Sequence, residues 1–126
     1  FTFSMHGKDN YPLHKEISDL DIPLATGTSD EVYLKLLEET LPGLIDRQKP
    51  DFIFYISGVD ILETDKLGHL KVSQAACRRR DEVVFEQCKK HQLPIVVAMG
   101  GGYSPRIADI VEAHCNTYRV AQELYF

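Results

Sequence analysis

Strand-like and helix-like segments alternate along the chain. Two continuous apolar runs, at residues 52–56 and 94–99, lie between turn-forming residues, a pattern typical of strands buried on both faces of a parallel sheet. Two shorter extended runs come before them, at residues 1–5 and 20–24. The polar segment 7–18 between these shorter runs is predicted to be a loop.

The first predicted helix begins near Thr28 and extends to about residue 46. Thr28 and Glu31 fit a capping box, in which two side chains satisfy free backbone N–H groups at the start of a helix. Apolar residues from Val32 onward recur at helical spacing. Pro42-Gly43 predicts a kink or a break in this helix.

Two further helices complete the pattern. One covers residues 73–91, and the other opens with Ser104 as N-cap and Pro105 in its first turn and runs through about residue 118. This alternation predicts an α/β fold of three layers, α/β/α, with a mainly parallel sheet covered on both sides. With only three or four strands, the sheet is expected to be incomplete, with an apolar edge through which chains self-associate.

Length and charge narrow the possible functions. The 126 residues suffice for one domain or part of one, and the net charge of −5 argues against a nucleic-acid binder. Acidic residues follow the basic run 78–80, which is therefore predicted to be a solvated helix face. No apolar run approaches the ~20 residues of a membrane span. Because Phe1 lies inside a strand-like run, we expect residues 1–126 to be the C-terminal part of a longer domain, with a trimmed start as the alternative.

The three cysteines do not predict a disulfide framework. Their number is odd, and no C-x-x-C spacing occurs. Cys77 and Cys88 are predicted to share one helix, which would separate them by roughly 16 Å. Buried, reduced thiols in a cytoplasmic protein are the simplest interpretation.

Chemically capable residues follow three of the predicted strands. His6, Asp60 and Tyr103 each come just after a strand, where open parallel sheets place their functional sites. Asp60 could be a metal ligand, a general base or a loop cap. Tyr103 could donate a hydrogen bond to a developing oxyanion, or it could be a packed aromatic beside a tight turn.

Four further features of the sequence carry weaker functional signals. The Gly100-Gly101-Gly102 turn could bring a backbone close to an anion, but it has no phosphate-loop lysine. Asp65 could anchor its own loop by accepting backbone N–H bonds. Asp19 and Asp21 are predicted to be loop or edge residues, and the histidines other than His6 are predicted to be surface or packing residues.

Taken together, these motifs resemble the C-terminal half of the histone deacetylase family. The matching segments cover nearly the whole chain in order: Phe3-Ser4-Met5-His6, Tyr11-Pro12, Pro23 to Thr28, Gly58-Val59-Asp60-Ile61-Leu62, Asp65 to Gly68, Arg80-Asp81 and Gly100 to Tyr103. The sequences of segments 58–68 and 79–85 are similar to those of the class IV type and its bacterial relatives.

The resemblance implies an arginase/deacetylase fold and hydrolysis of an N-acetyl amide by a zinc-bound water. By the resemblance, Asp60 is a metal ligand and Tyr103 the catalytic tyrosine that steadies the oxyanion. The remaining implied roles are an acetyl pocket at Gly101 and Gly102, a substrate channel at Leu67 and Tyr11, and a structural potassium site at Ser4 and Met5.

The chain also departs from the family pattern. It contains neither a His-His pair, which would supply the general base and acid, nor the Asp-x-His that would supply the other two zinc ligands. A catalytic zinc site needs three protein ligands, so this chain alone is expected to be inactive and to bind no zinc. The expected partner of the longer protein is an acetylated substrate: an acetyl-lysine protein, an acetylpolyamine or a small metabolite. The alternative is a non-catalytic α/β module that binds an anion at Gly100 to Gly102.

Overall fold

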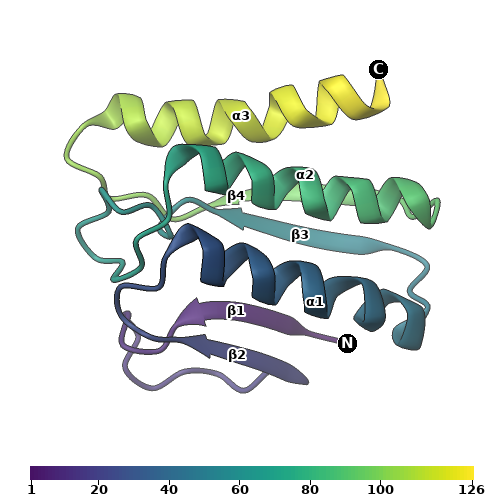
Figure 1. Cartoon of the computed structure of the whole chain (residues 1–126), viewed down its shortest axis with the longest axis horizontal. Helices are drawn as coiled ribbons and strands as arrows, with labels where there is room; N and C mark the ends of the chain where they lie inside the picture. The colour runs from purple at the N-terminus through teal and green to yellow at the C-terminus, as the bar shows by residue number, and fades with distance from the viewer.

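The computed structural model describes all 126 residues as four strands and three helices (Figure 1). In chain order these are β1 (Phe3–Gly7), β2 (Leu20–Leu24), α1 (Asp30–Gln48), β3 (Ile53–Gly58), α2 (Gln74–Lys90), β4 (Ile95–Gly100) and α3 (Ile107–Tyr125). The predicted α/β pattern with parallel strands is confirmed. None of the three helices is long and apolar enough to cross a membrane.

The strands form two separate parallel pairs. β1 pairs with β2 from Phe3 opposite Leu20, and β3 pairs with β4, whose last residues, Gly58 and Gly100, lie opposite each other. No ladder joins β1 to β3, so each of these strands keeps an unpaired edge. All four strands therefore end at the same side of the molecule, on the left in Figure 1.

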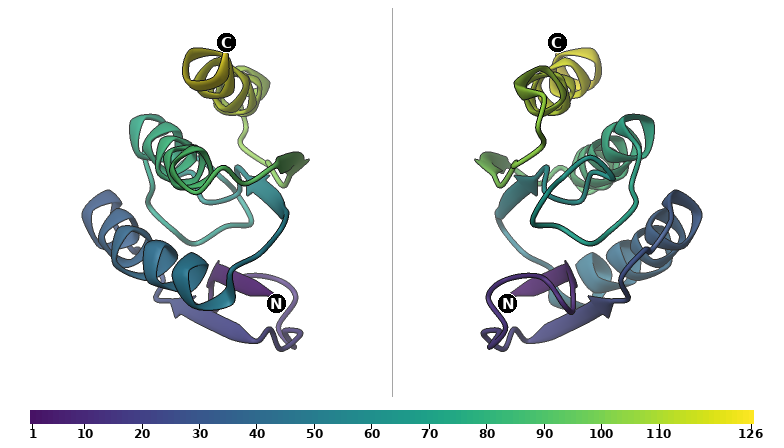
Figure 2. Two further views of the ribbon diagram at one scale, coloured as in Figure 1. Left: turned by 90° about the vertical axis from the view of Figure 1, so that its right-hand side faces the viewer. Right: turned by 90° about the vertical axis from the view of Figure 1, so that its left-hand side faces the viewer.

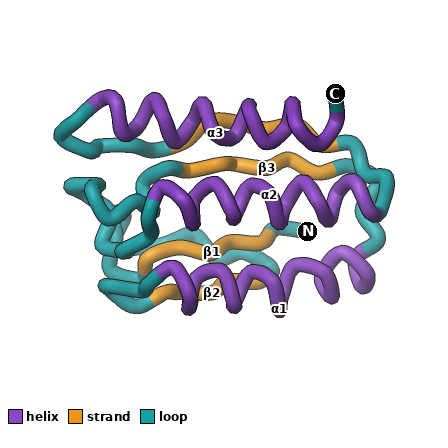
Figure 3. Tube along the Cα trace, turned by 45° about the horizontal axis from the view of Figure 1, so that its top comes forward, coloured by secondary structure: helices purple, strands orange, loops and turns teal.

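The helices form a single layer, in the order α1, α2, α3, on one side of the strands (Figures 2 and 3). Within these 126 residues the helices cover one face of the strands, so this chain forms two layers of the predicted fold, which was expected to be incomplete here. Side chains alternate along a strand, and Tyr55 of β3 packs edge-on against Phe85 of α2 at 6.2 Å between ring centroids. Phe54 and Ile56 point the other way and are 81% and 72% exposed. The expectation that both faces of these strands are buried is wrong for this chain.

The hydrophobic core lies at the carboxyl ends of the strands, beneath the loops that follow them. Its ten-residue centre joins the end of β2 and the loop after β3 to the first two turns of the helices: Leu24, Tyr33, Val59, Ile61, Leu62, Leu70, Val72, Ala76, Cys77 and Ala113. Burying these side chains fixes the loops in which the chemically capable residues lie.

Helix α1 differs from its prediction at both ends. Its N-cap is Ser29, whose side chain makes no capping hydrogen bond. The next residue, Asp30, accepts hydrogen bonds from the backbone N–H and the hydroxyl of Ser73, both at 2.7 Å. The Thr28 hydroxyl donates to the carbonyl of Ala25, so the predicted capping box is wrong. The helix also continues through Pro42 to Gln48 without a break.

Helix α3 begins later than predicted, with Arg106 as its N-cap, and it ends at Tyr125. Ser104 is not a cap, because its buried hydroxyl hydrogen-bonds that of Thr64 at 2.8 Å. The three cysteines are free, and Cys77 and Cys88 are buried in α2 as predicted. Burial raises the pKa of the Cys88 thiol to about 11, as expected of a packing residue.

Candidate active site

Two loops leave the ends of β3 and β4 side by side. The backbone N–H of Val59 donates to the carbonyl of Gly100 at 2.9 Å, which extends the β3–β4 pairing by one residue. The loop that contains Asp60 therefore lies against the Gly100-Gly101-Gly102 turn. This contact brings together the two segments that the sequence singled out.

The Asp60 side chain lies against the backbone of two glycines. A Cβ atom placed on Gly58 or on Gly101 would come within 2.7 Å of the Asp60 Oδ1 atom. Gly101 also has a φ of +65°, which residues with a Cβ rarely adopt. Glycine is therefore needed at position 101 both for the turn and to leave room for this carboxylate.

Burial raises the pKa of the Asp60 carboxyl above its ordinary value. Loss of hydration is the largest cause, repulsion from Asp65 adds to it, and the positive charge of Arg80 opposes it. A carboxylate that is partly removed from water in this way gains from a cation beside it. Asp60 is therefore a partly buried carboxylate, a property that fits a metal ligand and a general base alike.

Asp65 holds the two loops together. One of its oxygens accepts the backbone N–H groups of Leu67 and Gly68, at 2.8 and 2.7 Å. The other accepts the N–H of Tyr103 at 2.7 Å. The prediction that Asp65 anchors its own loop is confirmed, and the tie to Tyr103 is an addition that only the fold reveals.

The side chains of Tyr103 and Leu67 lie at the surface of these loops, 59% and 54% exposed. Gly102 has a φ of +111°, and a Cβ atom there would come within 2.8 Å of Ile110. The structure thus presents a phenol beside a turn that has no side chains of its own. Within these 126 residues Tyr103 is not a packed aromatic, and its exposure is compatible with a hydrogen-bond donor to a substrate.

A polar groove of about 310 Å³ separates the end of β1 from Asp60. Ser4, His6 and Tyr11 line it together with Asp60. The Ser4 hydroxyl and His6 Nδ1 are 2.8 Å apart. The Met5 side chain packs instead against the core, so only its backbone could contribute to a cation site.

The donor set of this chain fits zinc only in part. No three His, Cys, Asp or Glu side chains lie where they could hold one metal ion together. Asp60 can supply one oxygen ligand from the wall of the groove, whereas a catalytic zinc site requires three protein ligands. The remaining ligands of any such site would come from outside these 126 residues.

Sequence reasoning missed two residues around this site. Asn10 is buried, and its side-chain oxygen accepts the N–H of His69 at 2.9 Å, which ties the loop after β1 to the loop after β3. Arg80, predicted to lie on a solvated face, is buried beneath the end of β3. Its position three residues after Cys77 and four before Val84, on the apolar stripe of the helix, was the available signal.

Comparisons of the sequence with a family model and with known proteins point to the same family. Residues 1–118 match the histone deacetylase domain family. The chain is 39% identical over 125 residues to an uncharacterized protein of Picosynechococcus sp., covering 99% of this chain and 42% of that protein. It is 30% identical over 114 residues to histone deacetylase 2 of Arabidopsis thaliana, covering 88% of this chain and 30% of that one.

Solved structures share the fold. An acetylpolyamine aminohydrolase from Burkholderia pseudomallei superimposes with a TM-score of 0.78 at 19% identity, over 97% of this chain and 37% of that one. A histone deacetylase homologue complexed with SAHA gives a TM-score of 0.71 at 22% identity, over 98% and 39% of the two chains. This chain spans less than half the length of each of these relatives. It belongs to the histone deacetylase family of the arginase/deacetylase superfamily, whose fold it shares.

Proposed function

We propose that this chain is the C-terminal part of a single metal-dependent deacetylase domain that hydrolyses N-acetyl amides. The observation that carries the proposal is the contact between Asp60 and the Gly100-to-Tyr103 turn, held in place by Asp65. It sets a partly buried carboxylate against the turn that leads into Tyr103, at one end of a parallel sheet. A metal ligand and an oxyanion donor need this proximity, because both act on the same substrate carbonyl.

Each residue has a role in this proposal. Asp60 holds the metal, and the Tyr103 hydroxyl donates a hydrogen bond to the substrate carbonyl as negative charge develops on it. Zinc, when bound, would activate the attacking water. The proposal includes three further subsites. Gly101 and Gly102 line the acetyl pocket, Leu67 and Tyr11 line the substrate channel, and Ser4 with the Met5 backbone holds a structural potassium ion.

The remaining metal ligands and the general base are supplied in this proposal from outside the chain. The unpaired edges of β1 and β3 are where a further strand could add. Without those groups the chain alone is inactive. The substrate class extends over acetyl-lysine proteins, acetylpolyamines and small acetylated amines.

The alternative, an anion-binding module at Gly100 to Gly102, is less well supported. The Asp60 and Asp65 carboxylates flank this turn, and Asp65 already accepts the N–H of Tyr103. Helix α3 begins only at Ile107, so its N-terminal N–H groups do not adjoin the glycines. Two negative charges beside the turn would repel an anion.

The test is acetate release by the longer protein that contains this chain. Acetyl-lysine peptide, an N-acetylpolyamine and a small N-acetyl amine are the three substrates. Activity on at least one of them, lost on chelation and restored by zinc, is expected. A folded, zinc-loaded protein that releases no acetate from any of the three would contradict the proposal. Saturable binding of inorganic phosphate, with shifts of the Gly101 and Gly102 amide signals, would favour the anion-binding module.

A further inference from the structure

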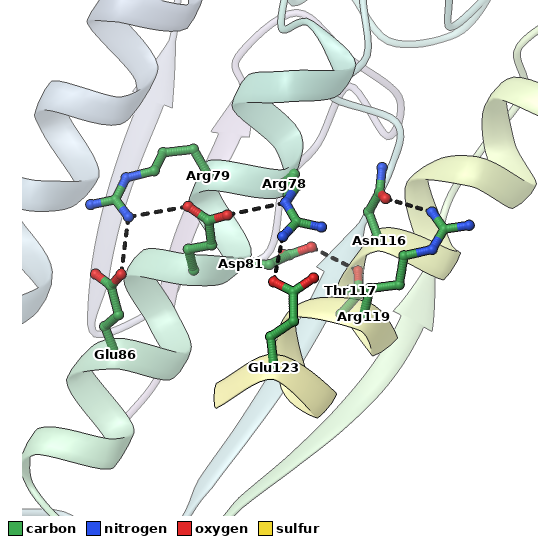
Figure 4. A network of polar contacts seen from close by, with 9 residues as sticks. Arg78, Arg79, Asp81, Glu86, Asn116, Thr117, Arg119 and Glu123 are labelled. Atoms are coloured by element: carbon green, nitrogen blue, oxygen red, sulfur yellow. Dashed lines mark hydrogen bonds and ion pairs between the residues drawn. The ribbon is translucent and has the colours of Figure 1, made fainter. Parts of the chain in front are cut away.

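A cation is buried directly beneath the candidate site. The Arg80 side chain, from the middle of α2, is only 5% exposed, and its Nη1 atom donates to the backbone carbonyl of Gly58 at the end of β3. Its neighbours Arg78 and Arg79 make the partly exposed ion pairs expected of a helix surface, as Figure 4 shows. Arg80 therefore differs from its neighbours in both position and partner.

The guanidinium of Arg80 is held in one orientation by Asp81. The Asp81 side chain is 0% exposed, and its Oδ1 atom lies 2.8 Å from Nη2 and 3.0 Å from Nε of Arg80. The hydroxyl of Tyr55 donates to the same Oδ1 atom at 2.5 Å. The hydroxyl of Thr117, on α3, donates to Oδ2 at 2.7 Å (Figure 4). Both oxygens of the carboxylate are thus engaged by groups from three elements.

The aromatic ring of Tyr55 also lies close to the Arg80 guanidinium. The Arg80 guanidinium carbon lies 5.7 Å from the centroid of that ring. Burial raises the pKa of Tyr55 well above its usual range, so the phenol keeps its proton and remains a donor to Asp81. Nε of Arg80 therefore donates to Asp81, and Nη1 donates to the Gly58 carbonyl.

The Gly58 carbonyl is two residues from Asp60. The segment between them is fixed from two directions: Val59 donates to the Gly100 carbonyl at 2.9 Å, and the Gly58 carbonyl accepts from Arg80. The first bond ties the segment to β4, and the second ties it to α2 and, through Asp81, to α3. Loss of the second tie would leave the backbone between Gly58 and Asp60 bonded to β4 and to its own loop, without a hydrogen bond to α2.

We propose that Arg80 is a positioning residue, whose guanidinium, oriented by Asp81, holds the Gly58 carbonyl and thereby fixes the segment that carries Asp60. The consequence for metal binding rests on the proposed function, but the mechanical role does not. A purely structural ion pair would stabilise the whole fold evenly. A positioning residue controls the local opening of one segment.

Amide hydrogen exchange in this chain separates the two roles. Arg80→Lys keeps the charge and removes the planar fork that reaches Gly58 and Asp81 together. The matched control is Arg79→Lys, one position earlier on the same helix. The probe is the Val59 amide, and the reference is the Lys8 amide, which donates to the Leu24 carbonyl at the same 2.9 Å distance in the other sheet.

In Arg80→Lys we expect Val59 exchange to accelerate at least about tenfold relative to Lys8, and the Gly58 carbonyl carbon shift to move toward that of a free carbonyl. Arg79→Lys should change neither. Equal acceleration at Val59 and Lys8, with the Gly58 shift unmoved, would show a merely structural ion pair and overturn the proposal. If Arg80→Lys does not fold, Thr117→Val replaces it as the test variant, because it removes only one bond to Asp81. Val59 exchange relative to Lys8 and the Gly58 carbonyl shift are measured again, and both are expected to change in the same direction by a smaller amount.

The longer protein provides a separate readout, its affinity for zinc. Loss of groups that orient a metal ligand typically weakens metal binding by about 10- to 100-fold. In a chelator competition, Arg80→Lys should therefore bind zinc more weakly than Arg79→Lys by a factor in this range. Equal zinc affinity in the two variants would contradict the extension to metal binding. Wild-type protein that holds no zinc would contradict the proposed function instead, and the exchange result would still decide the role of Arg80.

Discussion

The carboxylate of Asp65 accepts a hydrogen bond from the backbone N–H of Tyr103, at 2.7 Å and across 38 positions of sequence. The same side chain accepts from Leu67 and Gly68. One carboxylate thus sets the distance between the loop after β3 and the turn after β4. The location of Tyr103 relative to Asp60 depends on this side chain as much as on the pairing of the strands.

Asp65→Asn should destabilise the chain by about 1–3 kcal/mol, because an amide presents N–H donors where three backbone N–H groups require acceptors. Urea unfolding measures the change. Glu63→Gln is the control, since the exposed side chain of Glu63 makes no hydrogen bond. Equal midpoints for the two variants would show that Asp65 does not hold the loops together.

Tyr103→Phe should lower kcat of the longer protein roughly 10²–10³-fold, about 2.7–4 kcal/mol, with little change in KM. The substitution keeps the ring and removes only the hydroxyl, whose hydrogen bond strengthens as charge develops in the transition state. Tyr118→Phe, at an exposed position of α3, is the control. Near-normal kcat in Tyr103→Phe would refute the assignment.

Asp60→Ala should lose metal as well as activity, because it removes a ligand. Metal content per protein, measured by atomic emission after gel filtration, distinguishes this variant from Tyr103→Phe, which should keep its metal. Asp51→Ala, at an exposed site before β3, serves as the control. Full metal content in Asp60→Ala would mean that Asp60 is only a loop residue.

The chain of 126 residues alone should bind Zn²⁺ weakly or not at all, since Asp60 is its one residue assigned as a ligand and three are needed. Isothermal titration at neutral pH tests this. Stoichiometric binding tighter than about 1 µM that disappears in Asp60→Ala would show that two further ligands lie within the chain.

The isolated chain should self-associate. The sequence predicted association through a sheet edge, and the structure adds a bare apolar face where Phe54 and Ile56 are exposed on β3. Light scattering over a concentration series measures the mass. Phe54→Lys should shift the chain toward monomer, whereas Val32→Lys, at an exposed position of α1, should not. A wild-type chain that stays monomeric at high concentration would contradict the prediction.

Local sequence patterns were sufficient to predict the strands and helices and to predict where the candidate site lies. The apolar run before Ser57 and the run before Gly100 each gave a strand, and parallel strands place whatever follows them at one edge. Asp60 and Tyr103 were therefore expected near each other from the sequence. Their roles as ligand and donor came from family resemblance and stay predictions, as does the cytoplasmic location.

Helix boundaries depended on contacts that no local pattern contains. Thr28 was expected to cap α1, but its hydroxyl donates to the carbonyl of Ala25. Ser104 was expected to cap α3, but its hydroxyl bonds to that of Thr64, 40 positions away. In both cases the hydroxyl is bonded to a group other than the helix N–H, because a buried polar group must be satisfied wherever the fold allows it.

Sequence alone determined which segments are strands and helices, their parallel order, and that Asp60 and Tyr103 follow strands, because hydrophobic periodicity and turn residues act over a few positions. The prediction that His6 follows its strand is wrong, because β1 extends to Gly7 and contains His6. Tertiary structure decided the rest: one bare sheet face at Phe54, the tie from Asp65 to Tyr103, and the burial of Arg80 under Gly58. These features depend on which side of an element meets another element. Arg79 and Arg80 are adjacent in sequence, and Arg80 lies on the helix face of Cys77 and Val84, but only the packing between α2 and β3 brings its guanidinium to Gly58.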